Sequence, residues 1–197
     1  MHSLPDFIII GAQKCGTTSL FAYLKQHSEI DLPEEKEIHY FDNKYDKGIE
    51  WYKSQFPDNS GKISGEATPY YLFHPHVKER IFKHCPNTKL IVMLRNSTDR
   101  AYSHFVMEKN RNNEPLLTFE DAIVAEPIRL EKEQNKINND PKYCSKIHQR
   151  FSYLSRGKYY SQITEWLKYF PLERFLFIKS ERFFMNPEKE LHRVFYF

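Results

Sequence analysis

The sequence has little cysteine and no long apolar run. These two features argue against a disulfide-rich protein and against a membrane-spanning one. The three cysteines, Cys15, Cys85 and Cys144, are far apart and odd in number, so neither a disulfide framework nor a CxxC metal clip is expected. No stretch approaches the ~20 apolar residues that cross a bilayer, and the N-terminal MHSLPD lacks the basic and apolar regions of a signal peptide. We therefore expect a soluble chain without a transmembrane segment, in a reducing compartment such as the cytoplasm.

The sequence also lacks a strong excess of charge of either sign. Its 29 Lys and Arg residues face 26 Asp and Glu residues, which gives a formal net charge of +3. So small a charge does not predict a nucleic-acid partner, and it suits a small anionic ligand equally well. Charged residues make up 28% and aromatic residues 16% of the 197 residues, which is typical of a folded globular protein and fits one domain over residues 1–197.

Short apolar runs alternate with segments of helical periodicity along the chain. The runs at 7–10, 89–94 and 174–178 predict buried strands, and 62–66 predicts a weaker one. Helices are predicted over 17–26, 76–84, 97–111 and 159–169, and a further helix is predicted to begin after Asn186, with Pro187 at its first position. This alternation predicts an α/β fold of the P-loop-like, three-layer kind, in which helices flank a central, mainly parallel sheet.

Residues 108–150 interrupt this alternation with a polar composition rich in Asn, Lys and Glu. Only the stretch LLTFEDAI, residues 116–123, is expected to pack there as a helix. We interpret the segment as an excursion over the edge of the sheet that forms part of a substrate wall or lid.

The stretch GAQKCGTTSL, residues 11–20, follows the first predicted strand and has the GxxxxG spacing of a phosphate-binding loop. The lysine expected after the second glycine is missing, because Thr17 stands there and Lys14 lies inside the loop. A helix that begins near Thr17 would present free N–H groups and the positive end of its dipole to an anion. Three interpretations remain at this point: an altered nucleotide loop, an ordinary strand-to-helix turn, or an intact loop for a different phosphate.

The stretch LRNSTDRAYSHF, residues 94–105, offers a second anion site after another predicted strand. Arg95 directly follows the strand, where a guanidinium can bind a phosphate with two hydrogen bonds. Ser103 lies about one and a half turns into the predicted helix, close enough to face the same crevice. A kinase or NTPase would need a lysine in place of Thr17 and an aspartate at a strand end for magnesium, so no metal is implied.

The stretch EEKEIHYFD, residues 34–42, carries side chains that can move a proton. In an extended conformation Glu37 and His39 would share one face, opposite Lys36. This places a carboxylate beside an imidazole, although a charged surface loop would have the same composition.

Taken together, these motifs resemble the sulfotransferases that use 3′-phosphoadenosine 5′-phosphosulfate (PAPS), specifically the branch that contains the heparan sulfate and other carbohydrate sulfotransferases. The loop of that branch commonly reads Lys, any residue, Gly, Thr and then Thr or Arg, as residues 14–18 do. Its 3′-phosphate motif has an arginine at a strand end and a helix start of the RAYS type, and KEIHYF resembles the KExHFF motif of its glycan O-sulfotransferases. The resemblance covers almost all of the chain.

The resemblance implies transfer of a sulfuryl group from PAPS to a hydroxyl, or less expectedly an amine, of a carbohydrate-containing acceptor, without a metal. The implied catalytic residues are Glu37 as general base, Lys14 at the phosphosulfate bridge, and His39 to position the acceptor or tune Glu37. The implied donor-binding residues are Lys14, Gly16, Thr17 and Thr18 around the 5′-phosphate, and Arg95 and Ser103 at the 3′-phosphate. The alternatives are a non-catalytic nucleotide-binding remnant and a P-loop kinase or NTPase, and the location becomes the Golgi lumen if an N-terminal anchor has been removed.

Two departures from the family pattern affect what the resemblance implies. In GEATPYY, Ala67 takes the place of a lysine that often contacts the acceptor in heparan-type enzymes, which leaves a smaller glycan, a glycolipid or another alcohol open as acceptor. Full family domains also continue past the position of Phe197 into a basic, glycine-containing loop over the 3′-phosphate and adenine, so we expect a short family member or a fragment. Trp166 and Leu167 are expected in the core.

Overall fold

The computed structural model describes residues 4–57 and 61–197, which form a five-stranded sheet in the order β2-β3-β1-β4-β5. Residues 1–3, the start of the MHSLPD stretch, lie outside the described residues. All neighbouring strands are parallel, which confirms the predicted sheet. The strands are β1 (Phe7–Gly11), β2 (Ile30–Asp31), β3 (Ile63–Ala67), β4 (Lys89–Leu94) and β5 (Phe175–Lys179).

Strands β1 and β4 form the centre of the sheet because both of their faces are apolar. Every residue of β1 is buried, and β4 is buried from Leu90 to Met93. The two strands pair in parallel, with Ile8 opposite Leu90, and β1 pairs on its other side with β3. Apolar side chains on both faces require cover on both faces, as is usual for parallel sheets.

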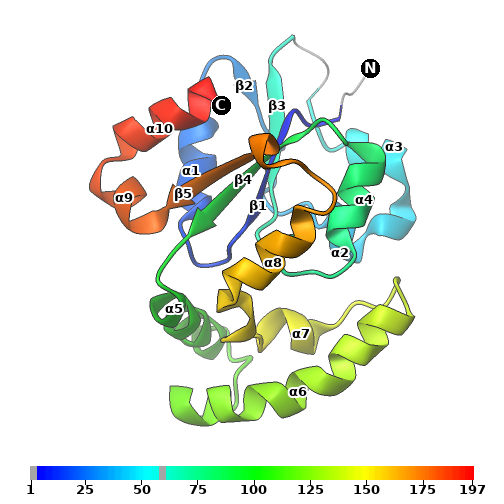
Figure 1. Cartoon of the computed structure of the whole chain (residues 1–197), viewed down its shortest axis with the longest axis vertical. Helices are drawn as coiled ribbons and strands as arrows, with labels where there is room; N and C mark the ends of the chain where they lie inside the picture. Colours follow the sequence, from blue (N-terminus) through cyan, green and yellow to red (C-terminus); the bar gives the residue numbers. More distant parts are fainter. Residues whose placement is uncertain (1–3, 58–60) are drawn as a thin grey trace.

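Helices cover the two faces of the sheet (Figure 1). One face packs against α4 (Val77–His84) and α8 (Tyr159–Trp166). The other face packs against α1 (Thr17–Leu24). Tyr23 of α1 contacts Phe183 of α9 (Ser180–Met185), and His27, in the turn after α1, contacts Phe195 of α10 (Pro187–Tyr196). Trp166 is buried, as expected, and its indole donates to the carbonyl of Leu72, whereas Leu167 is 41% exposed.

The order of the strands creates a crevice at the carboxyl edge of the sheet. From β1 the chain proceeds to β2 and β3 on one side, then crosses over β1 to reach β4 and β5 on the other side. Loops that follow β1 and β4 therefore leave neighbouring strands in different directions. This is where open parallel sheets bind their ligands.

The polar segment 108–150 is more helical than the sequence suggested, and the expectation of one short helix was wrong. Helix α6 (Phe119–Asn139) has 21 residues, and α7 (Lys146–Arg150) follows it. Both lie beyond the carboxyl edge of the sheet, beside α5 (Ser97–Asn110) (Figure 1). The buried face of α6 includes Glu126 and Glu133, so polar residues at buried positions hid the helical period. Glu126 accepts hydrogen bonds from the N–H groups of Leu154 and Ser155 at 2.6 and 2.8 Å.

The remaining elements are short. They are α2 (Tyr40–Asn43), α3 (Ile49–Lys53) and the 3-10 turns η1 (Tyr45–Lys47), η2 (Ser155–Gly157) and η3 (Leu172–Arg174). Over the described part of the chain, no helix combines the length and the apolar character that a membrane span requires.

Candidate active site

The loop after β1 turns sharply into α1 and leaves the start of that helix open. Gly16 has φ 94°, and a Cβ there would lie 3.0 Å from the ring of Phe184, so both the backbone and the space require glycine. Lys14 also adopts a left-handed conformation, with φ 69°. Among the described residues no side chain caps α1, so its first N–H groups remain available to an anion.

The segment after β4 brings the second predicted anion site beside the first. Asn96 caps α5 by accepting from the N–H groups of Thr98 and Asp99, which fixes the helix start at Ser97, where the sequence predicted it. Arg95 precedes this cap, and its Nη1 lies 3.5 Å from the carbonyl of Lys14. The two motifs, about eighty residues apart in sequence, are therefore in direct contact.

One cavity of about 410 Å³ unites these motifs with the candidate base. The residues predicted from the sequence that line it are Lys14, Gly16, Thr17, Thr18, Glu37, Arg95 and Ser103. Its volume is typical of small-molecule sites. Residues 108–150 contribute Arg111 to the described lining, which makes the predicted wall smaller than expected.

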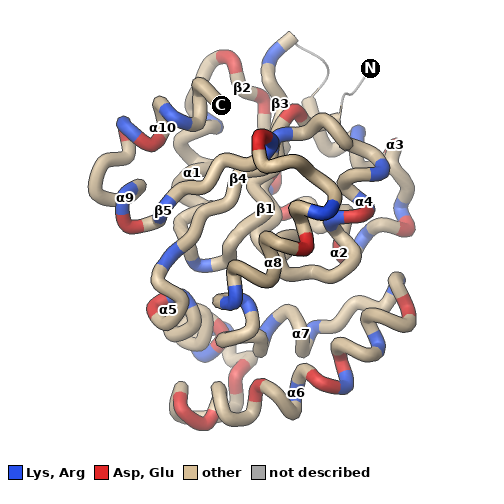
Figure 2. The backbone as a smooth tube through the Cα atoms, viewed as in Figure 1, with Lys and Arg blue, Asp and Glu red and all other residues tan. Residues whose placement is uncertain are grey.

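The cavity is electropositive. Lys14, Lys36, Arg95 and Arg111 line it, against the single carboxylate of Glu37 among the described lining residues. Burial lowers the pKa of Lys14, and the charges of Arg111 and Arg95 lower it further. Figure 2 shows basic residues in the loop after β1 and at the end of β4, whereas α6 carries both signs. Crowded cations of this kind would be stabilised by a bound anion.

Glu37 is held by its neighbours on both carboxylate oxygens. Its Oε1 accepts from the Lys36 ammonium at 2.7 Å, and its Oε2 lies 3.4 Å from Nε2 of His39. The backbone is not extended here, because Glu37 and His39 have φ values of 66° and 56°. Glu37 and His39 do meet as predicted, but the expectation that Lys36 would face away was wrong, since these left-handed residues fold the segment around the carboxylate.

His39 lies behind Glu37 and continues to a second carboxylate. Its Nδ1 is 2.6 Å from Oδ2 of Asp42, whose side chain is fully buried. Burial lowers the pKa of His39, but the hydrogen bonds and charges of Asp42 and Glu37 outweigh burial and raise it to about 9. Burial likewise raises the pKa of Glu37, but His39 and Lys36 outweigh it and lower it to about 2. At neutral pH Glu37 is therefore a carboxylate and His39 an imidazolium.

The sequence reasoning missed three residues of this site: Gln13, Arg111 and Asp42. The i,i+3 spacing of His39 and Asp42 could have suggested their contact if α2 had been predicted. Arg111 follows Ser103 and Met107 at intervals of four on α5, so it could have been placed on the same helix face. Gln13 carried no such local signal.

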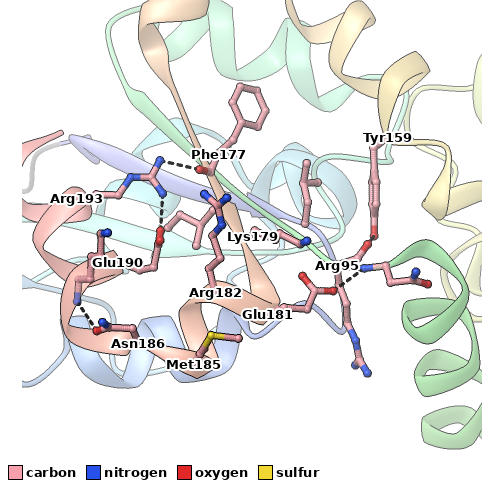
Figure 3. Close-up of a pocket in the computed structure, with 14 residues that line it drawn as sticks. Arg95, Tyr159, Phe177, Lys179, Glu181, Arg182, Met185, Asn186, Glu190 and Arg193 are labelled. Atoms are coloured by element: carbon pink, nitrogen blue, oxygen red, sulfur yellow. Dashed lines mark hydrogen bonds and ion pairs between the residues drawn. The ribbon is translucent and has the colours of Figure 1, made fainter.

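A larger cavity of about 840 Å³ begins on the other side of Arg95 (Figure 3). Arg95, Tyr159, Lys179 and Arg182 line it, and Glu181 accepts from the N–H of Asn96 at 2.9 Å. Tyr159 donates to the carbonyl of Arg95 at 3.1 Å, which ties α8 to the end of β4. Arg95 therefore separates a compact cationic cavity from a more open groove that an extended ligand can enter.

Fold and site together define a class. A parallel α/β sheet carries a glycine-containing loop and an arginine at its switch point, and both line one cavity together with a carboxylate. The sequence model of the sulfotransferase domain matches residues 4–197, and the chain belongs to the sulfotransferase family. The fold and the family predicted from the sequence are thereby confirmed.

Individual relatives agree with this assignment. The chain is 32% identical to the membrane-associated sulfotransferase kil1 of Dictyostelium discoideum, over 97% of this chain and 55% of that protein. It is 34% identical to the human heparan sulfate glucosamine 3-O-sulfotransferase 5, over 98% of this chain and 53% of that protein. The chain thus spans about half the length of these curated relatives. A sulfotransferase from Alicyclobacillus acidocaldarius superposes with a TM-score of 0.75 at 29% identity, covering 94% of this chain and 76% of that one.

Proposed function

We propose that the chain is a PAPS-dependent sulfotransferase that acts on a hydroxyl of a carbohydrate-containing acceptor. The observation that carries the proposal is a single cavity lined by the loop after β1, by Arg95 and Ser103, and by Glu37. Sulfuryl transfer requires these parts together: anion sites for the donor, a cation at the leaving phosphate and a base for the acceptor.

The donor side of the cavity fits the two phosphates of PAPS. The open N-terminus of α1, with Thr17 and Thr18, is suited to the 5′-phosphate, while Arg95 and Ser103 are suited to the 3′-phosphate. The lowered pKa of Lys14 reflects burial among positive charges, which an anion would offset. The nucleoside would extend past Arg95 into the groove of about 840 Å³.

When bound, PAPS supplies the sulfuryl group on a phosphate leaving group. Lys14 neutralises the negative charge that develops on that phosphate, and the α1 N–H groups hold it in place. Glu37 accepts the proton of the acceptor hydroxyl. Because its pKa is about 2, Glu37 is ionised at neutral pH but is a weak base. It is effective if the proton leaves late, after bond formation to sulfur has made the hydroxyl strongly acidic.

His39 and Lys36 hold Glu37 in position for this step, and Asp42 holds His39. His39 remains protonated at neutral pH, so its proposed role is to orient and charge-balance Glu37. The proposed acceptor class follows the relatives whose names specify glucosamine O-sulfation, together with the histidine of the KEIHYF motif. Ala67 is buried at the end of β3, so the acceptor must be recognised by other side chains.

A transfer assay tests the proposal. Purified protein is incubated with ³⁵S-labelled PAPS and either heparan sulfate, a neutral oligosaccharide, a glycolipid or a phenol, and labelled products are separated. We expect label on the carbohydrate acceptors. Calorimetry with the desulfated product, 3′-phosphoadenosine 5′-phosphate (PAP), and with AMP tests the donor site, and PAP should bind at least tenfold more tightly. PAP binding without transfer to any acceptor would indicate a nucleotide-binding remnant. Equal affinity for PAP and AMP would show that the proposed 3′-phosphate site does not exist.

A further inference from the structure

Arg156 is a buried cation from a distant part of the chain that contacts Gln13, a residue lining the candidate active-site cavity. It lies in η2 and is 2% exposed. Its Nε donates to Oγ of Ser152 at 2.7 Å, one Nη donates to the carbonyl of Gln149, and the other donates to Oε1 of Gln13. Its guanidinium also lies over the ring of Tyr70 at 4.7 Å. A buried arginine with a bond at each nitrogen is fixed in position.

This contact determines which way the Gln13 carboxamide points. Arginine has only donors, so the atom of Gln13 that faces it must be the oxygen. The NH₂ group is then directed away from Arg156. Gln13 lines the same cavity as Glu37 and Pro69, so an NH₂ group turned away from Arg156 can donate to a ligand there. A glutamine without such a partner could flip and present either atom.

Gln13 lies between β1 and the donor residue Lys14, and it lines the same cavity as Glu37. Arg156 lies near enough to Glu37 for that charge to raise its pKa, although burial dominates and lowers the pKa to about 10. Gln13 contacts Arg156 and lines the cavity that also contains the proposed base. An acceptor hydroxyl must approach Glu37, and its neighbouring oxygens then come within reach of the Gln13 NH₂ group.

We infer that Gln13 is a specificity-determining residue whose NH₂ group donates to an oxygen of the acceptor, and that Arg156 is the positioning residue that orients it. The inference rests on the proposed function for the identity of the acceptor class. Gln13 lies in the loop after β1, but neither Gln13 nor Arg156 is among the six residues proposed to hold the donor, which are Lys14, Gly16, Thr17, Thr18, Arg95 and Ser103. The expected signature is therefore a change in acceptor KM with little change in PAP affinity.

The substitution Gln13→Glu tests the donor directly. It keeps an oxygen for Arg156 and replaces the NH₂ group with a second oxygen, so packing is preserved. With heparan sulfate as acceptor we expect KM to rise at least tenfold, while the PAP dissociation constant by calorimetry stays within threefold. The control Gln26→Glu makes the same charge change at an exposed position just after α1, and it should leave KM and PAP affinity unchanged. A KM within twofold of the unmodified value, or a loss of PAP affinity as large as the rise in KM, would overturn the inference.

The role of Arg156 is tested by Arg156→Lys, which keeps the charge but cannot hold three acceptors in a planar fork. We expect a similar rise in acceptor KM, and in the double variant with Gln13→Glu little further rise, because both changes remove one interaction. Independent, additive increases would contradict the positioning role.

A measurement without turnover separates this inference from the proposed function, and it also serves if Arg156→Lys does not fold. The Gln13 side-chain NH₂ signal of ¹⁵N-glutamine-labelled protein is assigned by its loss in Gln13→Glu. Adding heparan sulfate to the PAP complex should shift this signal. An unshifted signal in protein that transfers sulfate would overturn the inference alone, whereas no sulfate transfer would count against the proposed function.

Discussion

The two sides of the cavity are built in different ways. On the proposed donor side, Gly16 and Thr17 lie in the short turn between β1 and α1, and Arg95 directly follows β4, so local chain geometry sets their positions. On the acceptor side, Glu37 lies in an irregular segment with left-handed residues, and its position depends on contacts with Lys36 and His39. The N–H of Glu37 also donates to the carbonyl of Ala67 at 3.1 Å, which anchors the segment to the end of β3.

We therefore expect donor binding and chemistry to respond to different substitutions. Changes on the proposed donor side should weaken PAP binding, since the backbone fixes the positions of those groups. Changes on the proposed acceptor side should alter turnover, since the contacts from Asp42 to His39 and from His39 to Glu37 keep the proposed base ionised. The following substitutions test whether PAP binding and turnover depend on different residues.

The largest effect is expected for Glu37→Gln, which removes the proposed base and keeps its shape. We expect kcat to fall by about 1,000-fold, within the range for general bases, with PAP affinity within threefold. The measurements are labelled sulfate transfer and calorimetry, and Glu35→Gln, at an exposed position of the same segment, is the control. Turnover within tenfold of the unmodified chain would show that Glu37 is not the base.

A smaller effect, confined to binding, is expected for Arg95→Gln. Loss of charged hydrogen bonds worth about 1.5–3 kcal/mol should weaken PAP by about 10-fold to 100-fold. AMP, which lacks the 3′-phosphate, should bind within twofold of the unmodified chain by calorimetry. Arg174→Gln removes an arginine that bonds Asn87 at the opposite edge of the sheet and is the control. Equal losses for PAP and AMP would place Arg95 at the shared 5′-phosphate instead.

Asp42→Asn should shift the pH dependence of kcat/KM, with a smaller effect on the maximum rate. The pKa of His39 is raised from 6.5 to about 9, so the imidazolium and the activity it supports are present at neutral pH and are lost as pH rises through about 9. Without the Asp42 charge that pKa falls, and the basic limb of the kcat/KM profile should move to lower pH. The same sign applies to folding: the stability from protonated His39 is fully present below pH 6.5 and is lost as pH rises through about 9.

Profiles of transfer and of chemical unfolding against pH check this expectation. Asp46→Asn, at an exposed position after α2, should leave both profiles unchanged. If the basic limb lies at the same pH in Asp42→Asn and in the unmodified chain, protonation of His39 does not control the reaction.

The smallest effect is expected for Ser103→Ala, which removes one neutral hydroxyl from the donor side. A hydrogen bond worth about 0.5–1.5 kcal/mol corresponds to PAP binding that is about 2-fold to 12-fold weaker. Ser161→Ala, on the exposed side of α8, is the control in the same titrations. A loss as large as that of Arg95→Gln would mean that Ser103 supports α5 and does more than contact the phosphate.

Much of the donor side was predictable because its signals are local. An apolar strand followed by glycine-containing turn residues predicts both the strand and the loop, and Ser97 marks a helix start in the sequence itself. The helix α6 was predicted too short because its buried face includes Glu126 and Glu133, whose partners lie elsewhere in the chain. Periodicity of apolar residues cannot report a face that is buried through hydrogen bonds.

The sequence by itself predicted the strands β1, β3, β4 and β5, the glycine-containing loop with Lys14 inside it, and the positions of Arg95 and Ser103 after β4. These follow from short-range patterns, in which neighbouring residues set the backbone. Tertiary structure alone decided that Asp42 would charge His39, that the left-handed backbone at Glu37 would turn its carboxylate into the cavity, and that Arg156 would orient Gln13. Gln13 and Arg156 are 143 residues apart, and only packing around the sheet brings such side chains within hydrogen-bonding distance.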